Sequence, residues 1–122
     1  MEKDWKASCK QLSLTIPAEK IFCLQISDAY KVPQPIQLQN SGPRPRRVWS
    51  DHFRPLPFEG YLPVADFVRA VLDTGYRGWF SYEIFDDGPD GTGRDYADML
   101  PVAKKAFDCQ ARLIDACSRA KL

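Results

Sequence analysis

Only two segments of the chain have the pattern of β-strands, and each follows a segment with the pattern of an amphipathic helix. Residues 21–26 are almost entirely apolar and have the length of a strand, and residues 79–85 repeat this pattern. Such short apolar runs are typical of strands covered on both faces, as in a parallel sheet. Helices are expected over residues 4–14, over residues 63–73 and from about residue 98 to 119. This alternation predicts parallel βαβ units.

The clearest helix is the one predicted over residues 63–73. Its apolar residues follow the i, i+3, i+4, i+7 spacing of one helical face: Val64, Phe67, Val68, Val71 and Leu72. Pro63 suits the first turn, and Gly75 suits the position just after the last one. The last helix is expected to bury one face that includes Phe107, Leu113 and Ile114.

Residues 30–61 show neither helical nor strand periodicity and contain most of the ten prolines. We therefore predict an irregular loop over this stretch. Its second half is rich in aromatic and charged residues, which a simple linker would lack. Long loops of this kind usually serve function, and we assign a functional role to this one.

The composition indicates a soluble, cytoplasmic protein. The chain has 17 basic and 16 acidic residues and a formal net charge of +1, which argues against nucleic acid or an anionic membrane as partner. It has no apolar run long enough to span a membrane and does not start with a signal peptide. Its four cysteines form no CxxC pair, so we predict buried, reduced thiols rather than a disulfide or a zinc site.

Side chains alternate across a strand, and this alternation divides both predicted strands in the same way. One side of the strands carries smaller and more polar residues: Cys23, Gln25 and Ser27, and Trp79, Ser81 and Glu83. The other side carries bulky residues: Phe22, Leu24 and Ile26, and Phe80, Tyr82 and Ile84. Strands of a (β/α)8 barrel show this division, with bulky residues toward the outer helices. Gln25 and Glu83 would then lie near the carboxyl ends of their strands, where barrel active sites are found.

Gln25 and Glu83 offer oxygen atoms of the kind that a hard cation such as Mg²⁺ or Mn²⁺ binds. The alternative is that Glu83 pairs with an arginine and Gln25 caps a backbone group. His52 is the only histidine, and a single loop histidine is more often a surface residue. Arg54 could bind a carboxylate or phosphate group, and Glu59 could orient a ligand or cap the following helix.

Two parallel strands cannot bury both faces of a sheet or protect both of its edges. The chain is therefore expected to be part of a larger α/β protein, with the remaining strands upstream or supplied by another chain. Its open sheet edges predict association with a partner.

Three segments in order resemble the last two βα units of the xylose isomerase-like TIM barrels, a family that includes sugar phosphate isomerases and epimerases. They are "KIFCLQISDA" at residues 20–29, "RPLPFEGYLPV" at residues 54–64 and "GYRGWFSYEIF" at residues 75–85. The resemblance is strongest to the 3-dehydroshikimate dehydratase branch. It implies an α/β fold in which residues 1–122 form one partial barrel domain.

The resemblance also implies roles for individual residues. Gln25 matches the metal ligand on the seventh strand, and Glu83 matches the one on the eighth. Three residues are expected to lie near the substrate: Arg54, His52 and Glu59. Asp28 and Ser81 are expected to support the metal ligands from the outer shell of the site. Members of the family use a divalent metal, Mg²⁺ or Mn²⁺, to polarise a carbonyl or hydroxyl while a base removes a neighbouring proton. The implied substrate is a polyhydroxylated carbonyl compound, and the implied reaction is dehydration of 3-dehydroshikimate to protocatechuate.

The chain also departs from the family pattern. The family's other two metal ligands, a Glu and an Asp, come from earlier strands that have no counterpart here. The chain alone is therefore expected to be inactive and to hold an incomplete metal site. Two alternatives stay open: a non-catalytic truncated product or interaction module, and an isomerase or epimerase acting on another sugar or cyclitol.

Overall fold

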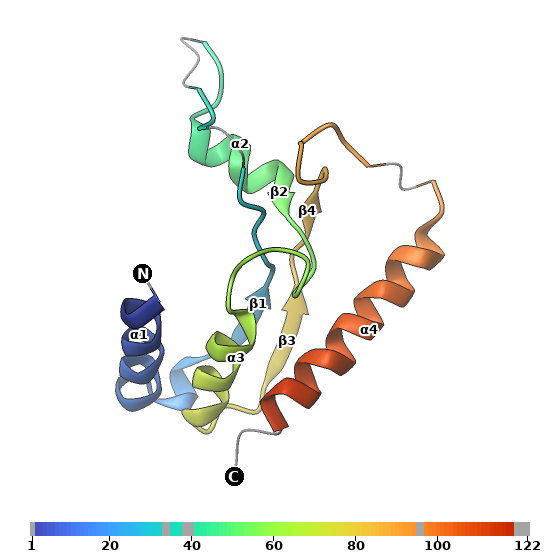
Figure 1. Cartoon of the computed structure of the whole chain (residues 1–122). Helices are drawn as coiled ribbons and strands as arrows, with labels where there is room; N and C mark the ends of the chain where they lie inside the picture. The colour runs from blue at the N-terminus through green and yellow to red at the C-terminus, as the bar shows by residue number, and fades with distance from the viewer. Residues whose placement is uncertain (1, 33–34, 38–40, 95–96, 119–122) are drawn as a thin grey trace.

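The computed structural model describes residues 2–32, 35–37, 41–94 and 97–118. Its central feature is a sheet of two parallel strands flanked by helices (Figure 1). The strands of this sheet are β1 (Cys23–Ile26) and β3 (Trp79–Tyr82), and the helices are α1 (Glu2–Thr15), α2 (Pro45–His52), α3 (Val64–Asp73) and α4 (Met99–Ser118). A short 3₁₀ helix, η1 (Ala18–Lys20), leads into β1, and a second small sheet pairs β2 (Phe53–Arg54) with β4 (Phe85–Asp86). The predicted parallel βα arrangement is confirmed.

The two faces of the main sheet differ as the alternation predicted. Ile26 on β1 is 3% exposed and belongs to a buried cluster with side chains of the two covering helices. The helical members of this cluster are Val64, Val68 and Leu113. On the other face, Cys23 and Ser81 lie side by side, with Sγ and Oγ 3.8 Å apart. Cys23 is exposed, like Gln25 on the same face of β1, so the prediction that it is buried was wrong.

Two predicted helices form as expected and pack against each other. In α3 the valines at positions 64, 68 and 71 are buried. Gly75, just beyond the helix, has φ +94°, a conformation that favours glycine and ends the helix as predicted. Helix α1 packs on α3, with the rings of Trp5 and Phe67 6.1 Å apart.

The long loop predicted over residues 30–61 is not entirely irregular, because α2 forms within it. Pro45 occupies the first turn of this helix, where its missing N–H costs no hydrogen bond. Arg47 and Asp51, one turn apart, form an ion pair on its surface. The polar sequence hid this helix, since it has no apolar face of the usual spacing. Residues 33–34 and 38–40 of the predicted loop lie outside the described residues.

The strand predicted over residues 79–85 is really two short strands. Strand β3 ends at Tyr82, and β4 begins at Phe85 and pairs antiparallel with β2. The chain changes partner here because β1 ends at Ile26, which leaves no parallel neighbour for the later residues. Glu83 lies at this change of partner rather than inside a strand, although its N–H still donates to the carbonyl of Ile26 at 3.2 Å.

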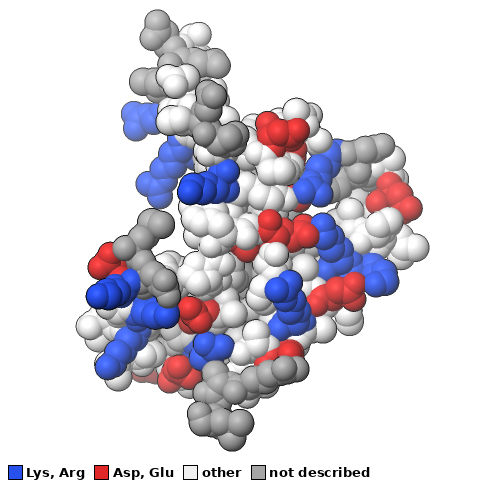
Figure 2. Space-filling model, viewed as in Figure 1, with Lys and Arg blue, Asp and Glu red and all other residues white. Residues whose placement is uncertain are grey.

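Acidic and basic side chains are interspersed over the face of the molecule seen in Figure 2. Among the described residues, no helix combines the length and hydrophobicity needed to cross a bilayer.

Candidate functional site

The predicted metal ligands lie at the carboxyl ends of the two parallel strands. Gln25 is in β1 and stands opposite Ser81 of β3 in the parallel register. Glu83 follows β3 by one residue. Gln25 is exposed, and the Glu83 side chain is 43% exposed. The fold therefore brings both side chains to the end of the sheet where active sites of parallel β/α proteins are found.

Arg54 connects the ends of these strands through four hydrogen bonds. Its Nε donates to Ser27 Oγ at 3.3 Å, and its Nη1 donates to Ser50 Oγ at 3.2 Å. Its Nη2 donates to both the carbonyl oxygen and the carboxylate Oε2 of Glu83, at 2.9 and 2.5 Å. The guanidinium also lies over the ring of Phe85, 5.1 Å from its centroid. Arg54 thus links the residues that follow β1, β3 and α2.

The ion pair of Arg54 with Glu83 is the arrangement that the sequence left open as an alternative to metal binding. Arg54 is 17% exposed, so this charge is held mostly out of water and benefits strongly from the carboxylate. The pair uses Glu83 Oε2, and among the described residues no hydrogen bond is made to Oε1 or to the Gln25 side chain. Each of these side chains keeps an oxygen that could bind a cation.

Asp28 is buried immediately after β1 and binds backbone amides rather than a side chain. Its Oδ1 accepts from the N–H groups of Ala29 and Leu62 at 2.7 and 2.9 Å, and its Oδ2 accepts from that of Phe58 at 3.0 Å. Its own N–H donates to the carbonyl of Pro55 at 2.8 Å. A carboxylate that is 1% exposed needs such donors, and they fix the segment that follows Arg54. Asp28 therefore holds the loop over residues 55–62.

Gly60 is needed where this loop crosses the residues after β1. A Cβ at this position would lie 2.5 Å from Asp28 Oδ1 and still closer to the carbonyl oxygen of Ala29. That carbonyl accepts a hydrogen bond from Tyr61 N–H at 3.0 Å, so the backbone cannot move aside without losing it. The glycine in the "RPLPFEGYLPV" segment thus has a steric reason.

Glu59 points away from Arg54 and toward α4. Its Oε2 lies 2.6 Å from Lys105 Nζ. The guanidinium of Arg112 lies over the ring of Phe58, with Cζ 4.1 Å from the ring centroid. These two contacts attach the loop over residues 55–62 to α4. The structure does not bring Glu59 together with Arg54 and Glu83.

His52 pairs with Asp87, a partner that the sequence analysis missed. Its Nδ1 lies 2.5 Å from Asp87 Oδ2, and Asp87 N–H donates to the carbonyl of His52 at 2.8 Å. These contacts extend the short ladder between β2 and β4. The two residues are 35 positions apart with no shared pattern, so sequence spacing alone could not have paired them.

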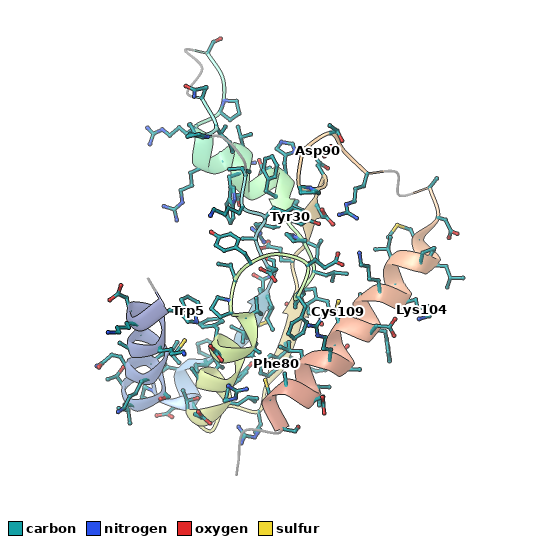
Figure 3. All side chains as sticks on the ribbon, in the orientation of Figure 1. Trp5, Tyr30, Phe80, Asp90, Lys104 and Cys109 are labelled. Carbon is teal, nitrogen blue, oxygen red and sulfur yellow. The ribbon has the colours of Figure 1, made fainter. Side chains whose placement is uncertain are left out.

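A second link crosses the same end of the molecule through Tyr30, which is labelled in Figure 3. The Tyr30 hydroxyl accepts from Arg94 Nη2 at 2.7 Å, and Arg94 Nε lies 3.1 Å from Asp86 Oδ1. Burial, and next the charge of Asp86, raise the pKa of Tyr30 to about 12. Tyr30 therefore stays neutral over the physiological range.

A complete cation site would need further ligands. Within the described ranges, no three His, Cys, Asp or Glu side chains converge closely enough to hold a metal ion. Gln25 and Glu83 contribute two oxygen donors of the type that Mg²⁺ and Mn²⁺ prefer, and these cations take about six ligands.

Comparison with known proteins gives one consistent result. A family model described as "Xylose isomerase-like TIM barrel" matches residues 3–117. A 3-dehydroshikimate dehydratase of Pseudomonas putida is 42% identical over 73 residues, and one of Pseudomonas aeruginosa is 37% identical over 73 residues. A solved xylose isomerase-like TIM barrel/4-hydroxyphenylpyruvate dioxygenase fusion protein superposes with a TM-score of 0.66 at 29% identity.

These relatives are much longer than the chain. The matched segments cover 60% of this chain but 10% of each dehydratase. The structural match covers 89% of this chain and 15% of the fusion protein. The chain therefore spans about a tenth of the curated relatives that it matches.

Proposed function

Because the chain belongs to the xylose isomerase-like TIM barrel family, we propose that it supplies part of the active site of a divalent-metal-dependent lyase that dehydrates 3-dehydroshikimate to protocatechuate. The observation that carries this proposal is the cluster at the carboxyl ends of β1 and β3. There Arg54, Glu83 and two serines meet through hydrogen bonds, with Gln25 on the adjacent strand. The names of the two Pseudomonas relatives support the choice of substrate.

In this proposal, Gln25 and Glu83 hold the metal together with ligands from outside these 122 residues. A bound Mg²⁺ or Mn²⁺ would act as a Lewis acid on a carbonyl or hydroxyl oxygen of the substrate. Arg54 keeps the Glu83 carboxylate in place through Oε2, which leaves Oε1 for a ligand. Asp28 contributes indirectly, because it fixes the backbone next to Arg54.

Arg54 has a second proposed task, which is to attract the carboxylate of the substrate. A guanidinium that is 17% exposed presents its charge in a partly water-excluded site, where it binds an anion more strongly than in bulk water. Among the described residues, its Nη1 donates to the neutral Ser50 hydroxyl, so this nitrogen can turn toward a substrate without breaking the pair between Nη2 and Glu83. His52 and Glu59 remain proposed substrate contacts, and the cytoplasm remains the proposed compartment.

A chimera tests this function in the context of a whole barrel. Residues 2–118 replace the corresponding segment of the Pseudomonas putida dehydratase, and turnover of 3-dehydroshikimate is measured with Mg²⁺ and with Mn²⁺. We expect activity in the chimera and a loss of at least 100-fold in kcat/KM in Glu83→Gln. The matched control is Asp108→Asn, an exposed carboxylate that pairs with exposed Lys104, and this variant should leave turnover unchanged.

Two results would contradict the proposal. One is a folded chimera that binds metal but does not turn over 3-dehydroshikimate. The other is a Glu83→Gln chimera that retains the activity of its parent. Turnover of a sugar or cyclitol in place of 3-dehydroshikimate would favour the isomerase or epimerase alternative.

A further inference from the structure

We propose that His52 is the general acid of the dehydration and that Asp87 holds its ring in place for this step. This assignment rests on the proposed function and deepens it, because a dehydration has to supply a proton to the departing hydroxyl group. Neither side chain belongs to the proposed metal site, and the two bind each other.

The small antiparallel sheet directs the side chains of His52 and Arg54 to the same face. Phe85 and Asp87 lie two residues apart on β4, and side chains at this spacing share one face of a strand. The guanidinium of Arg54 lies over the ring of Phe85. One step further along, His52 Nδ1 lies 2.5 Å from Asp87 Oδ2, and the His52 carbonyl accepts from Asp87 N–H. One face of β4 thus carries both basic side chains.

The residues between these positions face the other way. Asp86 of β4 has its Oδ1 3.1 Å from Arg94 Nε. Its partner in β2, Phe53, lies so close to Gly91 that a Cβ there would be 2.7 Å from the Phe53 ring. The opposite face of the ribbon is therefore covered by the loop that follows β4. The face that carries His52 is the one from which Arg54 reaches the carboxylate of Glu83.

This arrangement sets the spacing between His52 and the proposed binding site for the substrate carboxylate. A strand advances about 3.3 Å per residue, so Phe85 and Asp87 lie about 7 Å apart along β4. The imidazole bound to Asp87 and the guanidinium over Phe85 are separated in the same direction. A six-membered ring can bridge such a distance, with its carboxylate at Arg54 and a hydroxyl group at His52.

The imidazole of His52 is held at one nitrogen and open at the other. An ionised carboxylate only accepts hydrogen bonds, so Nδ1 donates to Asp87 and Nε2 is the nitrogen available for proton transfer. Among the described residues, no hydrogen bond is made to Nε2. The two side chains are 45% and 32% exposed, so a ligand can reach them. A carboxylate at Nδ1 orients such a ring and stabilises its positively charged form.

Other charged side chains near His52 bind partners of their own. The elements that pack together here are α2, β2 and β4. Asp87 is the carboxylate that binds the imidazole. The neighbouring ion pairs on these elements are Arg47–Asp51, Arg54–Glu83 and Arg94–Asp86.

The proposed step balances as an elimination of water. A base from outside these residues removes a proton from carbon, and the electrons of that C–H bond form the new C=C bond. The C–O bond of the neighbouring carbon breaks, and its electron pair leaves with the hydroxyl oxygen. His52 Nε2 gives this oxygen its proton, so water departs and the imidazolium becomes neutral. Hydroxide leaves poorly without such a proton, which is the reason for a general acid.

The chimera with the Pseudomonas putida dehydratase tests this role. His52→Asn keeps an amide that can donate to Asp87, but this amide cannot transfer a proton. We expect kcat to fall about 100-fold or more while KM changes by less than about threefold. Asp87→Asn should lower kcat less, by about tenfold, because the imidazole stays and loses only its orienting carboxylate. The matched control is Asp90→Asn, an exposed carboxylate of the same loop that binds Thr92, and it should keep the turnover of the parent.

Two further measurements separate proton transfer from a structural role. A general acid works in its protonated form, so kcat of the parent should fall as pH rises through the histidine range, about pH 5 to 8. This fall should be absent in His52→Asn. In His52→Ala, added imidazole should raise kcat by about tenfold, since it can replace the missing acid. Circular dichroism checks that each variant folds like the parent.

The outcomes distinguish this inference from the proposed function. An active parent chimera whose folded His52 variants keep full turnover would overturn the inference and leave the proposed function intact. Imidazole that does not raise kcat of His52→Ala would also overturn it. So would the loss of a rising limb of the pH profile in His52→Asn, because His52 would then act as a base. A folded parent chimera without turnover would overturn both.

Discussion

The two ends of the β1–β3 sheet are organised in opposite ways. At the carboxyl end, Asp28 and Arg54 are buried or nearly so, and together they hold the segments that follow both strands. At the amino end, Phe22 and Trp79 are 85% and 82% exposed. The Tyr76 hydroxyl lies within hydrogen-bonding distance of the carbonyl oxygens of both residues, at 3.1 and 3.0 Å. The carboxyl end of the sheet, which carries the polar cluster, is therefore held by contacts within the chain, whereas the amino end exposes large aromatic side chains.

The comparison teaches that the hydrogen bonds of Asp28 and Arg54 tie the loop at the polar end to the sheet, beside buried apolar residues such as Leu56. Each bond exists because a buried group must replace the water it lost. Substitutions at the polar end should therefore be costly, and substitutions at the amino end should cost little. The following predictions test that contrast from the largest expected effect to the smallest.

Among the substitutions that disturb the polar cluster, Gly60→Ala should cause the largest loss. The added methyl group would meet Asp28 Oδ1 and the Ala29 carbonyl, so we expect the free energy of unfolding to fall by roughly 3 kcal/mol, at the upper end for overpacking. Urea unfolding followed by tryptophan fluorescence measures this change. Gly93→Ala is the control, because its Cβ meets no atom within 4 Å and only its φ of +94° opposes alanine, at about 1 kcal/mol. Equal losses in the two variants would show that the crossing at Gly60 is not tight.

Asp28→Asn should come next. An amide keeps one acceptor oxygen but turns the other side into a donor, which cannot accept from Phe58 N–H. We expect a loss of about 2 kcal/mol in the same unfolding assay, in the range for a buried group left without its partner. Asp108→Asn, an exposed carboxylate, should change stability by less than about 0.5 kcal/mol. If the two substitutions cost the same, Asp28 does not hold the loop.

High pH should weaken the fold through two tyrosines. Burial raises the pKa of Tyr30 and of Tyr82 from 10.0 to about 12. The unfolded chain loses these protons near pH 10 while the folded chain keeps them, so the unfolded state binds fewer protons and stability falls as pH rises. This contribution is fully present below pH 10 and is lost between pH 10 and about 12. After allowance for partial exposure, we expect roughly 1 kcal/mol per tyrosine.

Unfolding in urea at intervals between pH 8 and 12 measures this decline. Tyr82→Phe should make the decline shallower without lowering stability at neutral pH, because the Tyr82 hydroxyl lacks a partner among the described residues. An unchanged pH profile in Tyr82→Phe would assign the decline to other groups.

Trp79→Ser should have the smallest effect. A side chain that is 82% exposed loses little contact on truncation, so we expect a change of less than about 0.5 kcal/mol. Ile26→Ser, on the adjacent strand but 3% exposed, should cost about 3 kcal/mol or more. Chemical denaturation followed by far-UV circular dichroism avoids dependence on the removed indole. A large loss in Trp79→Ser would mean that the amino end is more organised than its exposure indicates.

Much of the fold was accessible from local patterns. The spacing of valines identified α3, the glycine after it identified its end, and the two apolar runs identified the parallel strands. Helix α2 was missed because its local signals, a proline in the first turn and an i, i+4 ion pair, give no apolar periodicity. The split of residues 79–85 into two strands was missed because a change of pairing partner depends on where the neighbouring strand ends.

In the candidate site, too, some features could be predicted from local sequence patterns and others could not. Alternation predicted a shared face for Gln25 and Glu83, and their late positions in the two apolar runs predicted that they lie at one end of the sheet, where the structure has them. The partners of the charged loop residues were not accessible, since Glu59 turned out to bind Lys105, and His52 to bind Asp87. These pairs join positions 35 to 46 residues apart, and nothing in their local sequence favours one partner over another.

By itself, the sequence determined the βα alternation, the two faces of the sheet and the residue types at its carboxyl end, because each depends on periodicity within one short segment. The tertiary structure alone decided that Arg54 binds Glu83 and that Asp28 holds the loop. It also leaves Phe107 and Ile114 of α4 75% and 60% exposed, so the prediction that both are buried with Leu113 was wrong. Those outcomes depend on which distant segments meet, and a buried hydrogen-bonding group takes whichever partner the fold brings within reach.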